Sequence, residues 1–176
     1  MTEHSQEKRV KDPKEIYGRL RNRVLTAKRP RRINTPSEPT EAWGVLMDWG
    51  VVNGTVTVMS IIDGSASMYF SNGSGFIGGE GIAPVRAAAE RAVAETRKIR
   101  LPQQPSREFP LPAPHGVNFY VSTDAGVYAI HTTDGDLRAV GHPLGKLEGA
   151  MQEIITQFRL WRGSGLRGKK QSKKPN

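Results

Sequence analysis

Two tight-turn signals and a glycine-rich loop fall within residues 62–84, which read IDGSASMYFSNGSGFIGGEGIAP. Asp63-Gly64 and Asn72-Gly73 separate short apolar runs. Such pairs are typical of β-hairpins with type I′ turns, which need a positive φ at both central residues. Gly78–Gly81 then leads toward a helix that begins near Val85. The stretch therefore predicts two hairpins, a short third strand, a loop and a helix.

A looser version of the same pattern occupies residues 124–146. Asp124-Ala125-Gly126 matches the first turn, and Asp134-Gly135 matches the second. A short strand over residues 137–140, Gly141 and a helix from near Leu147 complete the match. We therefore expect two strand-strand-strand-helix halves in which Gly78 and Gly141 occupy equivalent positions after a short strand. The alternative is that any meander followed by a helix gives this pattern.

The remaining apolar periodicity completes an α+β fold. Residues 43–48, 55–62 and 117–121 have strand patterns, and residues 101–114 carry five prolines and predict an extended crossover, the proline strap. Apolar stripes between Val85 and Ile99 and between Leu147 and Trp161 predict two helices with one buried face each. The expected architecture is an antiparallel sheet of six or seven strands with these two helices packed on it.

An amphipathic helix is predicted near the N-terminus. Asp12-Pro13 provides a capping residue followed by proline at the first helical position. The apolar positions at helical spacing are Ile16, Leu20, Val24 and Ala27, with Arg19, Arg21, Arg23 and Lys28 over the remaining surface. We expect this helix to lean on the protein's own core or on another subunit.

The formal net charge of +9 is unevenly distributed along the chain. Residues 1–7 carry −2, residues 8–32 carry +9, residues 33–158 carry −5 and residues 159–176 carry +7. We interpret residues 1–32 as a basic N-terminal segment, residues 33–162 as a single domain and residues 163–176 as a disordered basic tail. A polyanion should therefore be attracted to the two ends. The residues expected to contact it are Arg29, Arg31, Arg32, Arg167, Lys169, Lys170, Lys173 and Lys174.

Several chemistries lack the residues that they need. The chain has no cysteine, so disulfides and thiolate metal sites are excluded. Its four histidines have no ligand spacing, and no motif nominates a catalytic residue, a metal or a cofactor. Gly73-x-Gly75-x-x-Gly78 has the letters of a dinucleotide fingerprint, but the helix begins too late, which favours turn glycines. Without a signal peptide or an apolar span, a cytoplasmic location is expected.

The loops before the two core helices are candidate anion sites, because helix N-termini present unpaired N–H groups and a positive dipole end. Glu80 could supply negative charge internally at the first loop. The second loop has no such residue between positions 141 and 145. Gly141, His142 and Gly145 are therefore the predicted anion-binding residues.

Several phrases in the chain resemble a family of small, uncharacterised bacterial proteins. They are Trp43-Gly44-Val45-Leu46-Met47, Tyr69-Phe70-Ser71, Ile77-Gly78-Gly79, Phe109-Pro110-Leu111-Pro112, Phe119-Tyr120 and Gln157-Phe158-Arg159-Leu160. The resemblance covers residues 43–160 and leaves the basic ends outside. That family has no established activity, so the resemblance implies a bacterial origin and a single domain and says nothing about chemistry.

Two functional hypotheses follow from the sequence. The first is a non-catalytic interaction module, with an acidic core that can self-associate and basic termini that contact a polyanion or an acidic partner. Nucleic-acid binding by those termini would be weak and sequence-independent, because residues 167–174 contain no aromatic residue for base stacking. The alternative is a small-ligand-binding or enzymatic domain with its site at the glycine-rich loops, which would require a concave pocket with converging polar groups.

Overall fold

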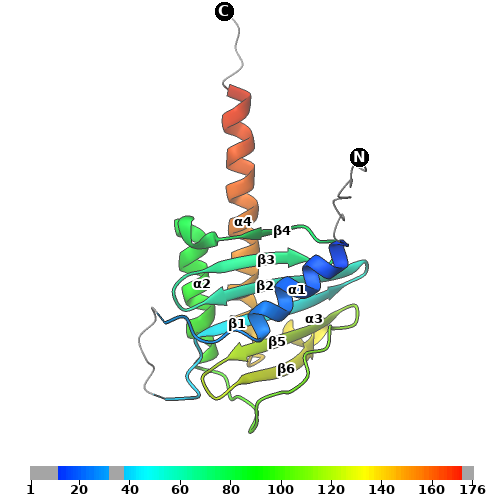
Figure 1. Ribbon diagram of the computed structural model, residues 1–176, viewed down its shortest axis with the longest axis vertical. Coiled ribbons are helices and arrows are strands. Elements are labelled where there is room, and N and C mark those ends of the chain that lie inside the picture. The colour runs from blue at the N-terminus through cyan, green and yellow to red at the C-terminus, as the bar shows by residue number, and fades with distance from the viewer. Residues whose placement is uncertain (1–11, 32–37, 172–176) are drawn as a thin grey trace, which may run out of the picture.

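The fold is centred on one antiparallel sheet with the strand order β4-β3-β2-β1-β5-β6 (Figure 1). The computed structural model describes residues 12–31 and 38–171, and only the backbone of residues 165–171. The strands are β1 Gly44–Val51, β2 Gly54–Ile61, β3 Ala66–Phe70, β4 Gly75–Ile77, β5 Gly116–Ser122 and β6 Val127–Thr133. The predicted α+β class with a six-stranded sheet is thus confirmed.

Helices lie on both faces of this sheet. They are α1 Pro13–Leu25, α2 Ala83–Thr96, α3 Asp134–Leu137 and α4 Gly145–Gln171, with the short 3-10 turn η1 at Gly79–Gly81. As predicted, α2 and α4 pack on the sheet, and they also pack against each other. Figure 1 shows α1 crossing the opposite face. The molecule therefore has three layers, with β1 near the middle of the central one.

Strand alternation gives the two faces of the sheet different side chains. From β1, Val45 and Met47 join the core beneath α2 and α4, whereas Leu46 lies in a separate cluster with Leu25 of α1. The small side chains of α2 permit close contact with the sheet, because Ala88 and Ala92 are fully buried. Alternation along the strands therefore produces two distinct buried layers.

The predicted hairpins form, but with a different turn geometry. Gly64 and Gly73 have φ values of 82° and 83°, whereas Asp63 and Asn72 are not in the positive-φ region. In the first turn, Gly64 N–H donates to the Ile61 carbonyl at 2.9 Å. The second turn repeats this arrangement with Gly73. Each loop has three residues with glycine alone in the left-handed conformation, so the type I′ prediction was wrong.

The second half of the chain departs from the first after two strands. Asp134-Gly135 was predicted to be a turn, but it begins helix α3, and residues 137–140 form no strand. The local cause is the Thr133 side chain, whose hydroxyl accepts a hydrogen bond from Asp136 N–H at 3.1 Å and caps the helix. Gly78 and Gly141 share left-handed φ values of 82° and 79°, yet only Gly78 directly follows a strand.

The structure changes two expectations about the helices. Helix α1 begins at Pro13 after the Asp12 cap, as predicted, but its buried residues are Tyr17, Arg21 and Leu25. The predicted apolar face is therefore displaced by one position, and Arg21 points inward instead of outward. Helix α4 continues past Gly163, where the sequence predicted an unstructured tail, to Gln171. Residues 172–176 lie outside the described part of the chain.

The proline strap passes very close to β1. A Cβ atom added to Gly50 would lie only 2.0 Å from the carbonyl oxygen of Ala113. The backbone N–H of His115 donates to the Gly50 carbonyl at 2.8 Å. Only glycine permits this approach, which holds the end of the strap against the end of β1.

Candidate functional site

The most conspicuous exposed feature is the projecting end of α4, defined here as residues 159–171. Helix α4 has 27 residues, which corresponds to a length of about 40 Å. Figure 1 shows it rising well beyond β4, the last strand on that side of the sheet. Two large apolar side chains lie near its base, since Leu160 is 61% exposed and Trp161 is 50% exposed. The projecting end therefore offers apolar and basic groups together.

Aromatic packing anchors the projecting end to the sheet. The buried ring of Phe158 stacks on Phe76 of β4, with 5.5 Å between the ring centroids. The Arg162 guanidinium lies 5.7 Å from the centroid of the same Phe76 ring. A cation at this distance is attracted to the face of the ring. The base of the projecting end is therefore held in a defined orientation.

A buried polar network lies on the other face of the sheet, beneath α1. Arg21 Nη2 is 2.6 Å from Asp48 Oδ2, and Arg21 Nε donates to the same oxygen at 2.8 Å. The Thr57 hydroxyl donates to Asp48 Oδ1 at 2.5 Å. Because the Thr57 proton is used in this way, the Tyr17 hydroxyl 2.7 Å away donates to Thr57. The Asp48 side chain is fully buried and both of its oxygens have partners.

The proline strap completes this network through the carbonyl oxygen of Pro110. Tyr120 O–H donates to it at 2.6 Å, and Asn118 Nδ2 donates at 3.0 Å. Since the Asn118 amide nitrogen is the donor, its Oδ1 accepts from His131 Nδ1 at 2.8 Å. The network thus joins α1, four strands and the strap. Its polar groups are hydrogen-bonded to one another, which is typical of a structural role.

Burial dominates the titration of this network. Desolvation raises the pKa of Asp48, although the Arg21 guanidinium and the Thr57 hydroxyl both oppose the rise. Burial by itself lowers the pKa of Arg21, but the hydrogen bond and the charge of Asp48 more than reverse this, so the pKa of Arg21 is raised. Desolvation also raises the pKa of Tyr17 and of Tyr120. These directions follow from a low-dielectric site that contains one ion pair.

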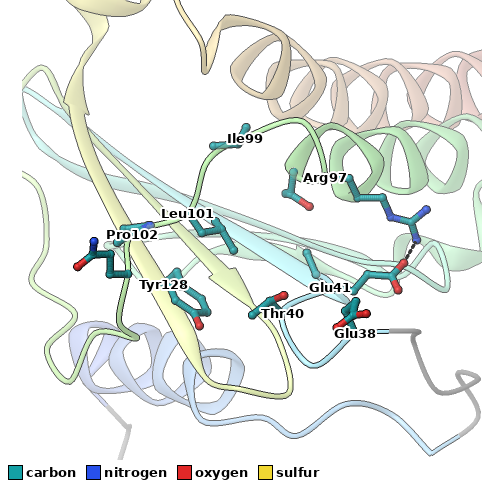
Figure 2. A pocket seen from close by; sticks show the side chains of 11 residues that line it. Glu38, Thr40, Glu41, Arg97, Ile99, Leu101, Pro102 and Tyr128 are labelled. Atoms are coloured by element: carbon teal, nitrogen blue, oxygen red, sulfur yellow. Dashed lines mark ion pairs between the residues drawn. The ribbon is translucent and has the colours of Figure 1, made fainter.

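A cavity of about 500 Å³ lies at the C-terminal end of α2 (Figure 2). The ion pair between Arg97 and Glu41, at 2.6 Å, lies on one side of it, and Tyr128 and Leu101 lie on the other. The hydroxyl of Thr96, which also lines the cavity, donates to the Val93 carbonyl at 2.6 Å. The Arg97, Glu41 and Thr96 side chains that line the cavity are thus bound to other groups of the protein.

A smaller cavity, the α1 cavity, lies between α1 and the sheet and measures about 330 Å³. Its lining is mostly apolar and includes Leu20 and Val24 from α1, Met59 and Ile61 from β2, and Trp43 just before β1. No local sequence pattern predicts this cavity, because it depends on how α1 crosses the strands. The first cavity has no lining residue from the glycine-rich loops, whereas the α1 cavity reaches Ile77, the residue before Gly78.

The predicted polyanion-contacting residues are only partly described. The Arg29 guanidinium binds the Asp124 carboxylate, with 3.0 Å between Arg29 Nε and Asp124 Oδ1, so its charge is already engaged. Arg31 is exposed. Arg167, Lys169 and Lys170 belong to the helical backbone of α4. Arg32, Lys173 and Lys174 lie outside the described residues, so the role assigned to this group stays a prediction.

The predicted anion site at Gly141, His142 and Gly145 has internal partners. His142 Nδ1 accepts a hydrogen bond from the Leu144 backbone N–H at 3.2 Å. The Gly145 N–H donates to the His142 carbonyl at 3.0 Å. Glu148 adds a negative charge in the first turn of α4. The backbone donors and the helix dipole at the N-terminus of α4 are thus largely compensated by groups of the protein itself. The prediction of an anion site overlooked Glu148.

The described residues contain neither a metal-binding cluster nor a helix suited to cross a membrane. No three His, Asp or Glu side chains in residues 12–31 and 38–171 are grouped so that they could hold a metal ion. Within the same ranges, no helix combines the length and the apolar character that crossing a membrane requires. No protein-family model, curated protein or solved structure matches the chain. The resemblance to a bacterial family therefore stays a prediction.

Proposed function

We propose that the protein is a non-catalytic interaction module that binds an acidic protein partner through the projecting end of α4. The observation that carries this proposal is that α4 continues past the edge of the sheet with Leu160 and Trp161 exposed. Residues 159–176 carry seven basic residues and no acidic one. A basic helix with an apolar patch at its base is complementary to an acidic surface that also offers apolar side chains.

The composition of the patch favours a protein over a nucleic acid. Tryptophan and arginine are the residue types most enriched among those that dominate protein–protein binding energy. Here Trp161 is half exposed, and Arg162 is oriented by its contact with Phe76. Leu160 would gain nothing from a phosphate backbone, whereas it would bury apolar area against a protein.

The positive charge of the projecting end also limits which partners it can bind. A symmetric pairing of two projecting ends would bring Arg159 and Arg162 of both copies together, and like charges oppose such an interface. An acidic partner avoids this repulsion. The domain itself carries −5 over residues 33–158, so a head-to-tail contact with a second copy is the form of self-association that charge permits.

Fluorescence anisotropy with a labelled helical peptide of Glu and Leu residues tests the proposal on the full chain. Trp161→Ala should weaken binding about 30-fold, as expected for a hot-spot residue. Arg159→Glu should weaken it about tenfold and reduce its salt dependence. The matched control is Arg91→Glu, an exposed reversal on α2, which should change affinity less than twofold.

Other outcomes would redirect or refute the assignment. Failure of the peptide to bind, or equal effects of Arg159→Glu and Arg91→Glu, would contradict it. A single-stranded oligonucleotide that binds as tightly, and that ignores Trp161→Ala, would assign the end to non-specific polyanion binding instead. Sedimentation of the chain alone as an oligomer that Trp161→Ala dissociates would make a second copy the partner.

A further inference from the structure

We infer that the α1 cavity binds a small apolar monocarboxylate. This inference is independent of the projecting end, because the cavity lies on the other face of the sheet. Its volume of about 330 Å³ falls within the range of small-molecule sites. At about 30 Å³ per water-sized group, it accommodates about ten non-hydrogen groups. The aliphatic walls formed by Leu20, Val24, Met59 and Ile61 suit a hydrocarbon chain of that size.

The rim of the cavity supplies a positive charge. Arg23 projects from α1, lines the cavity and is exposed. Within the described residues its side chain makes no hydrogen bond or ion pair, in contrast to Arg21, which is paired with Asp48. A guanidinium presents parallel donors that match the two oxygens of a carboxylate. A ligand with its chain inside and its carboxylate at the rim satisfies both requirements.

An unsatisfied polar group on the wall supports the presence of a ligand. Trp43 is 5% exposed, and its indole Nε1 is buried without a hydrogen-bond partner in the described structure. Such an orphaned donor costs about 1–3 kcal/mol and calls for an explanation. The indole nitrogen is itself buried, so a ligand oxygen in the cavity would reach it only after the side chains that cover it have moved. The unliganded packing is therefore incomplete at this wall.

Ser60 has the other orphaned side-chain atom of the described residues, but it does not contribute to this site. It lies on the same face of β2 as Val56 and Val58, whose side chains pack beneath α2 and α4, on the side of the sheet opposite α1. Its hydroxyl therefore points away from α1, and only its backbone borders the cavity. Ile77 of β4, by contrast, also lines the cavity and is 68% exposed, which places an apolar side chain at an entrance.

Isothermal titration of the full chain with octanoate, octanol and butanoate tests the inference. Octanoate should bind one to one with a dissociation constant below about 1 mM, and octanol about tenfold more weakly because it lacks the charge. Butanoate should bind too weakly to saturate, because it leaves most of the cavity unfilled. Arg23→Gln should remove the preference for octanoate over octanol. Arg19→Gln, on the same helix but outside this cavity, is the matched control and should retain it.

Two further variants separate cavity binding from surface attraction. Ala27→Phe fills the end of the cavity beside α1 and should abolish binding of both eight-carbon ligands, while the circular dichroism spectrum stays that of the parent. If that variant fails to fold, Ser67→Leu fills the cavity from the strand side. Trp43→Phe should lower octanoate affinity about fivefold through loss of the indole donor.

The inference fails under any of three results. One is the absence of saturable octanoate binding up to about 5 mM, well above the expected dissociation constant. Another is an equal loss on Arg19→Gln and Arg23→Gln, which would indicate attraction to the basic surface of α1. The third is octanoate binding that persists in folded cavity-filling variants.

Discussion

The two faces of one sheet are buried in different ways. Beneath α2 and α4 the strands present Val45, Met47 and Phe119 to an almost wholly apolar core. Beneath α1 the same strands present Asp48 and Asn118, whose polar groups bind α1 and the strap. Apolar contacts are non-directional, whereas ion pairs and hydrogen bonds require a defined geometry. We therefore expect α2 and α4 to provide most of the stability, and the network to fix where α1 lies.

The largest expected effect comes from breaking the buried ion pair. Asp48→Ala leaves the Arg21 guanidinium without its partner in a buried position. We expect the free energy of unfolding to fall by about 3–5 kcal/mol, measured by urea denaturation at pH 7. The double variant Asp48→Leu with Arg21→Met should recover most of this loss, because an apolar pair needs no charge compensation. A double variant as unstable as the single one would show that the geometry of the network itself stabilises the fold.

The apolar face should respond to volume instead of charge. Ala89 of α2 is fully buried against the sheet, and Ala89→Leu inserts a side chain where there is no space. Thermal and urea denaturation should show a loss of about 1–3 kcal/mol. Ala87→Leu on the exposed side of the same helix controls for helix propensity and should be nearly neutral. Similar losses at both positions would contradict the close packing described for α2.

A smaller effect is expected from a single hydrogen bond of the network. Tyr17→Phe removes the donor to Thr57 while it keeps the ring that α1 buries. Stability should fall by about 0.5–1.5 kcal/mol. The Thr57 hydroxyl keeps its bond to Asp48, so no buried donor is left without an acceptor. A loss as large as that of Asp48→Ala would mean that Tyr17 positions the ion pair.

The smallest effect is confined to alkaline solution. Burial raises the pKa of Tyr17 and of Tyr120 above the ordinary value of 10.0. Their contribution to stability is therefore complete below about pH 10 and is lost as the pH rises through the folded-state values, because the unfolded chain releases these protons first. Urea midpoints between pH 8 and pH 11 should fall less steeply above pH 10 in Tyr17→Phe than in the parent. Parallel curves would argue against the desolvation of this tyrosine.

Local sequence signals predicted the apolar face well. Turn glycines, strand alternation and the alanine stripe of α2 each report a short-range preference, and the first half of the fold agrees with them. The prediction for α1 failed because Tyr17 and Arg21 are amphipathic residues whose burial depends on partners far along the chain, at Asp48 and Thr57. The strand predicted at residues 137–140 depended on Asp134-Gly135 being a turn. In the structure the Thr133 side chain caps helix α3 at this place instead. The α1 cavity, which exists only between elements, had no local signature at all.

The strap between α2 and β5 divides the chain into two segments that share one sheet and one core. The first segment ends with α2 and contains the central strand β1. This strand pairs with β5 of the second segment, from the pair of Gly44 with Ser122 to the pair of Trp49 with Val117. Helices α2 and α4 also pack across the same division. Arg107 lies exposed in the strap, where a protease can reach it. Two fragments separated there would each expose half of one core, so their reassociation would restore the fold in the manner of a split reporter.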